Sequence, residues 1–175
     1  MDEPQTNFHF RLMVLTHKFR DFFVPRKNIL KDAGIEEGFH VLDYGCGGGG
    51  YIAATAELVG QSGKIYALDI HPLAIQKVQE LALKKQLKNV ETIRSDCKTG
   101  LPDGSLDVVL LYDTFHSLSD PNGVLHELHR VLKPSGFLSF SDHHLKEVEI
   151  LAHVTDGGLF TLLRKGKKIY SFVKT

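Results

Sequence analysis

The feature that most constrains the fold of this chain is the glycine-rich segment Gly-Cys-Gly-Gly-Gly-Gly, residues 45–50, which follows a short apolar segment. Glycine lets the backbone turn tightly and lets a ligand approach the main chain. The segment after the run has a helical apolar pattern, and the first turn of such a helix offers free N–H groups and the positive end of its dipole. A strand, a glycine turn and a helix in this order predict an α/β fold that binds a nucleotide-like ligand at the turn.

The apolar pattern alternates between strand-like and helix-like segments along the rest of the chain. The expected strands are residues 40–44, 64–69, 90–94, 106–112 and 137–141, and the expected helices between them are residues 51–59, 72–85 and 121–132. This alternation predicts parallel crossovers. Residues 159–163 and 169–173 flank a basic turn and predict a closing antiparallel hairpin. We therefore expect an α/β, Rossmann-like, doubly wound sheet of about seven strands, mostly parallel.

The N-terminal segment has a different pattern. Five apolar residues recur at helical spacing: Phe8, Leu12, Leu15, Phe19 and Phe22. A second helix is expected from Pro25 to near Gly34. Basic residues surround the stripe, so it could lie on a membrane, but such a stripe more often packs on its parent domain. We expect a single domain, residues 1–175, in which N-terminal helices (1–38) form a lid over a Rossmann-like core (39–175).

Composition limits the partners of the chain. Its 175 residues fit one domain, and Lys plus Arg equals Asp plus Glu at 21 each. This balance argues against nucleic acid or an anionic membrane as a partner. The two cysteines lack metal-site spacing, and the polar first residues do not resemble a secretory signal. No apolar run approaches transmembrane length. A cytoplasmic location is expected.

The glycines alone fit two kinds of cofactor. Gly45, Gly47 and Gly50 satisfy the dinucleotide pattern, and Asp69 follows about 20 residues later, as a dinucleotide-dependent oxidoreductase requires. Asp43 argues against that interpretation, because a carboxylate two residues before the first glycine would repel a phosphate. It would instead attract a cofactor that carries a positive charge and an amino group.

The motif Asp43-x-Gly45-x-Gly47-x-Gly49 resembles the first motif of the class I S-adenosylmethionine-dependent methyltransferases. Further segments follow in the order typical of that family: residues 112–118, Tyr-Asp-Thr-Phe-His-Ser-Leu, and residues 127–138, Glu-Leu-His-Arg-Val-Leu-Lys-Pro-Ser-Gly-Phe-Leu. The resemblance covers residues 41–141. It implies that S-adenosylmethionine is the cofactor and S-adenosylhomocysteine the product.

The resemblance also implies roles for single residues. Asp69 matches the acidic residue that binds the ribose hydroxyls, and Ile70 matches the residue that packs on adenine. Asp96 and Cys97 resemble the pair that holds the adenine amino group. The expected cofactor residues are Asp43, Tyr44, Gly45, Cys46, Gly47, Gly49, Asp69, Ile70, Asp96, Cys97 and Tyr112. As alternatives, Asp43 could cap the glycine turn, Asp96 could be a turn residue, and Cys97 could be a small buried residue.

Methyl transfer is a direct in-line displacement, so a base is needed only if the acceptor must lose a proton. Candidates to orient or deprotonate the acceptor follow the fourth and fifth strands: Asp113, His116, Asp142, His143 and His144, of which we single out Asp113, His116 and His143 as catalytic. The chain has ten histidines, and any of them could instead be structural. Adjacent histidines in a strand extension point apart, so no metal site is expected.

The acceptor itself is not identified by the sequence. No large insertion separates the strands, which favours a small-molecule acceptor or a pocket completed by a second subunit, so a homo-oligomer stays open. Asp113 and Thr114 stand where some relatives have an Asn-Pro-Pro-Tyr-type segment, which disfavours an amide-nitrogen or DNA-base acceptor. A non-catalytic scaffold that retains the methyltransferase fold is the alternative from another functional class.

Overall fold

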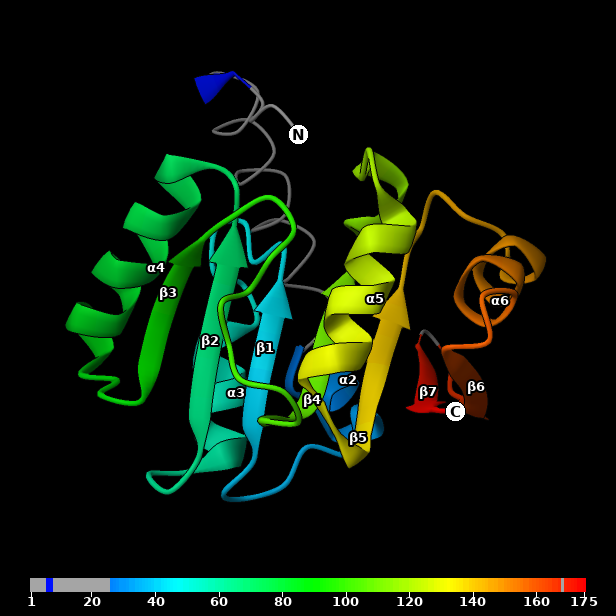
Figure 1. Cartoon of the computed structure of the whole chain (residues 1–175). Coiled ribbons are helices and arrows are strands. Elements are labelled where there is room, and N and C mark those ends of the chain that lie inside the picture. Colours follow the sequence, from blue (N-terminus) through cyan, green and yellow to red (C-terminus); the bar gives the residue numbers. More distant parts are fainter. Residues whose placement is uncertain (1–5, 8–25, 168) are drawn as a thin grey trace.

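The computed structural model describes residues 6–7, 26–167 and 169–175 (Figure 1). The helix expected at residues 8–22 lies outside these described residues. The described elements are α2 (Arg26–Ala33), β1 (His40–Tyr44), α3 (Ile52–Val59), β2 (Lys64–Asp69), α4 (Pro72–Lys85), β3 (Val90–Arg94), β4 (Leu106–Tyr112), the 3-10 turn η1 (Phe115–Ser117), α5 (Pro121–Val131), β5 (Leu132–Ser141), α6 (Glu147–Thr155), β6 (Phe160–Lys165) and β7 (Tyr170–Lys174).

A seven-stranded sheet organises the described part of the chain, in the order β3-β2-β1-β4-β5-β7-β6. Strands β1 to β5 are parallel, and β7 is antiparallel to both β5 and β6. This confirms the expected doubly wound sheet with a C-terminal antiparallel hairpin. The parallel strands point upward in Figure 1. From β1 the sheet continues through β2 to β3 on one side, and from β4 it continues through β5 to the hairpin on the other, so the strand order reverses between β1 and β4. Ligands of open α/β sheets bind at such a point.

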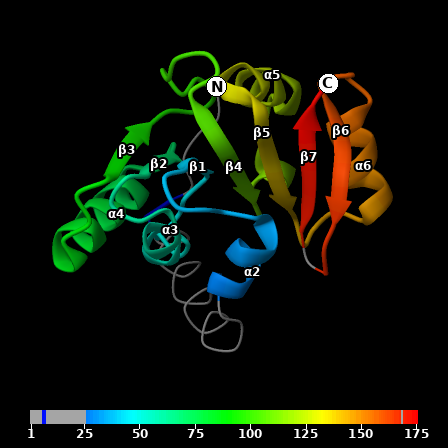
Figure 2. The same ribbon diagram turned by 90° about the horizontal axis from the view of Figure 1, so that it is seen from below.

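The sheet is covered by helices on both faces (Figure 2). One core cluster joins Val108 and Leu110 of β4 to Leu30 of α2 and Ile52 of α3. On the other face, the next residues along β4, such as Val109, join buried side chains of α5 and α6 in a second cluster. Alternate residues of a strand point to opposite faces, so a strand that is apolar throughout must be covered on both sides.

Two elements differ from expectation. Strand β5 begins at Leu132, earlier than the expected residue 137. Leu132 pairs with Leu106, and the register then shifts between this pair and the next one, which joins Val108 to Phe137. The helix before it therefore ends one residue earlier than expected. Helix α6 was not predicted at all. It begins after Lys146, whose N–H donates to the Glu149 Oε2 at 2.7 Å, and Ile150 is one of its two buried residues.

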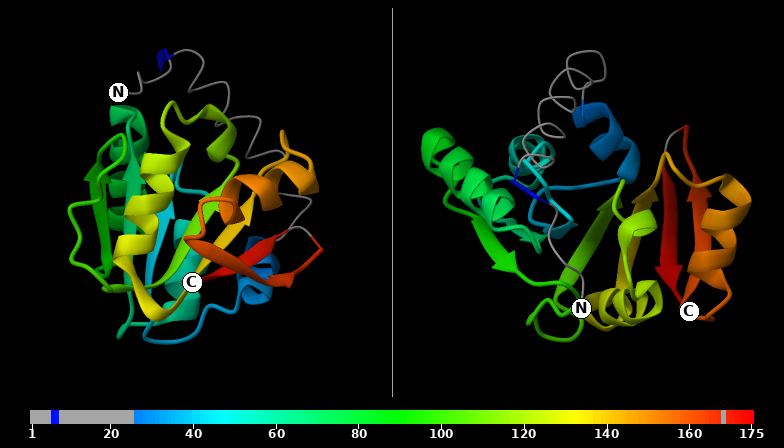
Figure 3. Two further views of the ribbon diagram at one scale, coloured as in Figure 1. Left: turned by 45° about the vertical axis from the view of Figure 1, so that its right-hand side comes forward. Right: turned by 90° about the horizontal axis from the view of Figure 1, so that it is seen from above.

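The hairpin closes the sheet at the edge farthest from β3 (Figure 3). Strand β7 pairs with β5, which leaves β6 outermost, with α6 packed against it. Helix α2 begins at Arg26, close to the expected start at Pro25, and buries Leu30 and Ala33 in the core. A lid role for residues 1–38 stays a prediction. Among the helices within the described ranges, none combines the length and apolar character that crossing a bilayer requires.

Candidate cofactor and acceptor site

The glycine loop lies at the carboxyl end of β1 and adopts a backbone that favours glycine. Gly45, Gly47 and Gly49 have φ angles of +78°, +50° and +77°. The N–H groups of Gly45 and Cys46 both donate to the Leu68 carbonyl, at 2.8 and 2.9 Å. These bonds hold the start of the loop against the end of β2. At Gly49, a Cβ would lie 3.1 Å from Val78 of α4, so a larger residue would press on that helix.

Thr114 is a site residue that the sequence analysis did not select. A Cβ added at Gly45 would overlap the Thr114 side chain. The Thr114 hydroxyl is held in turn by donating to the Tyr112 carbonyl at 3.0 Å. The ends of β1 and β4 therefore meet at the point where the strand order reverses, with glycine required for the contact.

Asp69 ties the end of β2 to the glycine loop. Its Oδ2 accepts from the Gly47 N–H at 2.8 Å, and its Oδ1 accepts from the His71 N–H at 2.8 Å. Burial raises the pKa of Asp69 above its usual value, although these backbone hydrogen bonds act in the opposite direction. Each carboxylate oxygen can accept more than one hydrogen bond, so Asp69 can also accept from a ligand hydroxyl.

Asp43 is the most unusual acid of the site, because it lies in β1 with only 3% of its surface exposed. Within the described residues, its Oδ2 atom has no hydrogen-bond partner. Burial raises the pKa of Asp43 to about 7, the positive charge of Arg26 lowers it, and the negative charge of Asp69 raises it. A buried oxygen without a donor is costly, so this position fits a ligand that brings an N–H donor or a positive charge.

Arg26 is a second residue that the sequence did not point to. The first residue of α2 extends its guanidinium to the glycine loop, where a Cβ at Gly50 would overlap it. The guanidinium carbon also lies 4.2 Å from the centroid of the Tyr51 ring. Helix α2 therefore brings a cation to the same loop that carries Asp43 at its base.

The other expected cofactor residues lie around this loop. The Tyr44 hydroxyl donates to the Asp96 carbonyl at 3.1 Å, which joins β1 to the segment after β3. Cys97 next to it is partly buried against the core. Burial raises the pKa of the Cys46 thiol well above its usual value, so Cys46 contributes its backbone rather than a thiolate. Ile70 directly follows β2.

Tyr112 lies deeper than the other members of the expected set. Its hydroxyl is 2.6 Å from the Ser139 Oγ, and its ring meets the Tyr51 ring edge-on at a centroid distance of 5.0 Å. Burial raises the pKa of Tyr112. The side chain packs in the core behind the loop, where it supports Tyr51.

The expected catalytic residues gather at the ends of β4 and β5. The His143 Nδ1 lies 2.7 Å from Oδ1 of Asp113, which itself has a left-handed φ of +51°. The His116 Nδ1 lies 2.9 Å from Oδ2 of Asp142, whose side chain is fully buried. The structure thus forms two histidine–aspartate pairs side by side.

One expectation about these histidines is wrong. His143 and His144 were expected to point apart in a strand extension, but their ring centroids lie 4.0 Å apart. The strand ends at Ser141, and the His144 N–H donates to Oδ1 of Asp142 at 3.0 Å. The backbone therefore turns after Asp142, and both rings reach the same side as His116, whose ring centroid is 4.1 Å from that of His144.

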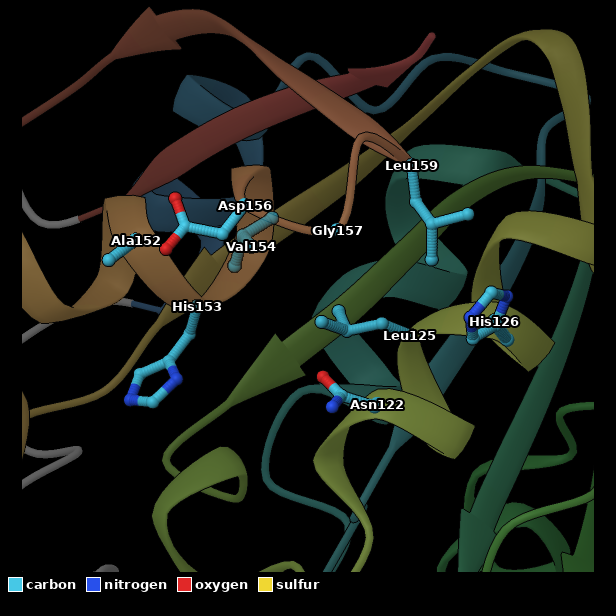
Figure 4. Close-up of a pocket in the computed structure, with 9 residues that line it drawn as sticks. All are labelled: Asn122, Leu125, His126, Ala152, His153, Val154, Asp156, Gly157 and Leu159. Atoms are coloured by element: carbon cyan, nitrogen blue, oxygen red, sulfur yellow. The ribbon is translucent and has the colours of Figure 1, made fainter.

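A separate pocket of about 380 Å³ lies between α5 and α6 (Figure 4). Its lining contains Asn122, His126, His153 and Asp156, together with apolar residues of both helices. None of the expected cofactor or catalytic residues lines it. The part of its lining that comes from the C-terminal region is the end of α6 and the turn that follows it, up to Leu159.

Comparison with known proteins agrees with this geometry. A family model described as "Methyltransferase domain" matches residues 35–171. A solved structure of a SAM-dependent methyltransferase from Aquifex aeolicus is 30% identical, with a TM-score of 0.76, and the match covers 86% of this chain and 88% of that one.

Among curated relatives, a demethylmenaquinone methyltransferase from Geobacillus sp. (strain WCH70) is 31% identical over 129 residues, which are 73% of this chain and 55% of the relative. A ubiquinone/menaquinone biosynthesis C-methyltransferase, UbiE, from Pseudoalteromonas translucida (strain TAC 125) is 27% identical over 79% of this chain and 56% of its own length. The chain thus spans about half the length of these curated relatives. The extent of the family match and the likeness to the Aquifex aeolicus structure lead to one conclusion: the chain belongs to the family of S-adenosylmethionine-dependent methyltransferases.

Proposed function

We propose that this chain binds S-adenosylmethionine at the glycine loop and transfers its methyl group to a small-molecule acceptor, leaving S-adenosylhomocysteine. The observation that carries the proposal is the buried Asp43, whose Oδ2 lacks a donor among the described residues. Bound S-adenosylmethionine supplies an already activated methyl group on its sulfonium sulfur.

The protein's own task is to hold the two partners in line. We assign Asp43 and the backbone of residues 44–47 to the positively charged amino-acid end of the cofactor, because that end offers N–H donors to a buried carboxylate. Asp69, already fixed by the Gly47 and His71 N–H groups, accepts from the ribose hydroxyls. We assign the surroundings of the adenine to Ile70, Asp96 and Cys97.

The acceptor is assigned to the ends of β4 and β5. His116 uses Nδ1 toward Asp142, so Nε2 is the ring nitrogen that takes a proton from an acceptor that must lose one. Asp142 fixes the ring and stabilises the charge that forms on it, as a carboxylate does for a catalytic imidazole. We assign Asp113 and His143 the role of orienting the acceptor.

The names of the curated relatives support one acceptor class over others. The curated relatives are named for methylation of demethylmenaquinone and for ubiquinone and menaquinone biosynthesis. We propose a small ring compound of quinone type as the first acceptor to test. A cytoplasmic location and a pocket completed by a second copy of the chain stay predictions.

The test is a transfer assay with methyl-labelled S-adenosylmethionine and a panel of small acceptors that includes a demethylmenaquinone in reduced form. The expected result is label in the acceptor and an equal amount of S-adenosylhomocysteine. Binding of S-adenosylhomocysteine without transfer to any acceptor would favour the non-catalytic scaffold. Absence of both binding and transfer would contradict the proposal.

A further inference from the structure

A second kind of site lies at the ends of β4 and β5, and it does not depend on the proposed function. Tyr112 pairs with Ser141 in the parallel register, so the residues that follow, Asp113 and Asp142, leave the sheet side by side. One ligand atom each from Asp113, Asp142 and His143 lies within 4.8 Å of the others. We propose that these three side chains bind a divalent first-row transition-metal ion.

The charge arrangement favours a cation. Two carboxylates at the ends of neighbouring strands repel each other unless a positive group lies between them. The Asp142 side chain is fully buried, and within the described residues its ion-pair partner is an imidazole, His116, rather than a lysine or an arginine. A buried carboxylate needs charge compensation, which a bound metal ion supplies.

The hydrogen bonds of Asp142 leave room for this ion. Its two oxygens accept from the His144 N–H, the His116 N–H and the His116 Nδ1. A carboxylate offers about four lone-pair positions, so one remains for a metal. The three donors fix the carboxylate in one orientation, as hydrogen bonds from surrounding groups commonly do for metal ligands.

The donor set defines the class of ion. Two carboxylates and one imidazole combine hard oxygen donors with a nitrogen donor, which suits Mn²⁺, Co²⁺ or Zn²⁺ better than Ca²⁺ or Mg²⁺, which favour oxygen ligands. The His143 Nδ1 lies 2.7 Å from the Asp113 Oδ1, a spacing that two neighbouring ligands of one ion can adopt when the proton between them is released. Three protein ligands leave positions open for water or another oxygen ligand.

The test is a titration of the full chain, freed of any affinity tag and treated with a chelator, with cobalt(II) chloride. The visible absorption of Co²⁺ reports its ligands directly, and the titration contains neither cofactor nor acceptor. The expected result is absorption that saturates at a single ion per chain and is displaced by Zn²⁺. Absence of saturable absorption, or displacement by Ca²⁺ as readily as by Zn²⁺, would overturn the proposal.

Matched variants locate the ion. Asp113→Asn and His143→Gln each remove one ligand and should weaken Co²⁺ binding by about 10-fold or more, by the scale of losses seen around metal sites. The controls are Asp32→Asn and His126→Gln, which alter exposed residues outside the cluster and should bind as the wild type does.

Circular dichroism of each variant confirms that it is folded, and the buried Asp142 is left unchanged for that reason. Binding that is insensitive to both ligand variants, or equally sensitive to His126→Gln, would place the ion elsewhere and refute the site. Because cofactor and acceptor are absent from the titration, failure here is distinct from failure of the methyl-transfer assay.

Discussion

The cofactor side of the molecule, at the ends of β1 and β2, differs in kind from the acceptor side, at the ends of β4 and β5. On the cofactor side the contacts are made mostly by the main chain. Three glycines of the loop have left-handed φ angles, two loop N–H groups donate to one carbonyl, and Asp69 accepts from two further backbone N–H groups. On the acceptor side the two acids also accept from backbone N–H groups, but each is in addition paired with a histidine side chain, Asp142 with His116 and Asp113 with His143.

This difference separates two properties of the enzyme that we propose. Backbone geometry can be disturbed only by altering glycines or the acids that bond the loop, and such changes should act on cofactor affinity. Side-chain pairs can be replaced without moving the loop, and such changes should act on turnover. A substitution on the cofactor side should therefore change ligand affinity, and a substitution on the acceptor side should change turnover and leave ligand affinity as it is.

The largest effect is expected from Gly45→Val, which should abolish S-adenosylhomocysteine binding. The new side chain would overlap Thr114, and the φ of +78° strains any β-branched residue. The control is Gly104→Val, since Gly104 has a φ of +60° but no neighbour within 4 Å of an added Cβ. Isothermal titration calorimetry measures both. If the two variants bound the ligand equally, close approach at Gly45 would not matter to the site.

His116→Gln should lower kcat by about 100-fold or more when the acceptor must lose a proton, because general-base catalysis commonly contributes that much. Cofactor affinity should stay unchanged, since the pair with Asp142 lies outside the glycine loop. Steady-state kinetics with saturating cofactor checks this, with His126→Gln as the matched histidine control. An unchanged kcat would remove His116 from the proton path.

Asp69→Asn should weaken S-adenosylhomocysteine binding by about 10-fold to 100-fold, because that is the loss of affinity expected when a hydrogen bond to a charged group is removed. The amide can accept only one of the two N–H groups that now bond the carboxylate. Asp107→Asn is the control, because Asp107 likewise bonds a backbone N–H, that of His40 at 2.8 Å, but at the amino end of β1. Equal loss in both variants would mean that the effect is on folding.

The smallest effect is a pH dependence centred on Asp43, whose pKa is raised from 3.8 to about 7 by burial. Between these values the folded state holds a proton that the unfolded state has lost, so the free energy of unfolding of the ligand-free protein should fall as pH rises toward 7. A cationic ligand favours the ionised acid, so S-adenosylmethionine affinity should rise over the same range, by less than about 10-fold per pH unit.

Asp43→Asn provides the comparison for this pH effect. The amide cannot ionise, so both slopes should flatten between pH 5 and about 7. Urea unfolding and calorimetric titrations at several pH values measure them. Slopes that persist in the variant would assign the titration to another group.

The sequence predicted the sheet well because its strands carry a strong signal. Val108 to Leu111 of β4 are buried on both faces, and a fully apolar run can hardly lie elsewhere. Helix α6 was missed because it has only 9 residues and buries only Ile150 and Val154, so its apolar pattern is too short to mark a helix. Its start was nevertheless encoded locally, in Glu149, which accepts from the backbone three residues earlier.

The site was predictable where it depends on local motif and not where it depends on tertiary contact. Asp43 and Asp69 flank the glycine loop in sequence and could be selected from it. Arg26 and Thr114 reach that loop from distant positions, and no sequence pattern marks the contacts. The turn at Asp142 did have a signal, because an aspartate often accepts from the N–H two residues later and ends extended structure.

The most direct test of the central claim, that the glycine loop holds S-adenosylmethionine, is the thermal unfolding midpoint with S-adenosylmethionine, S-adenosylhomocysteine and NADH in turn. A ligand at 100 times its dissociation constant adds about 2.7 kcal/mol, which should raise the midpoint by roughly 5–10 °C in a domain of this size. We predict this shift with both adenosyl compounds and none with NADH. A shift with NADH alone, or with none of the three, would contradict the account.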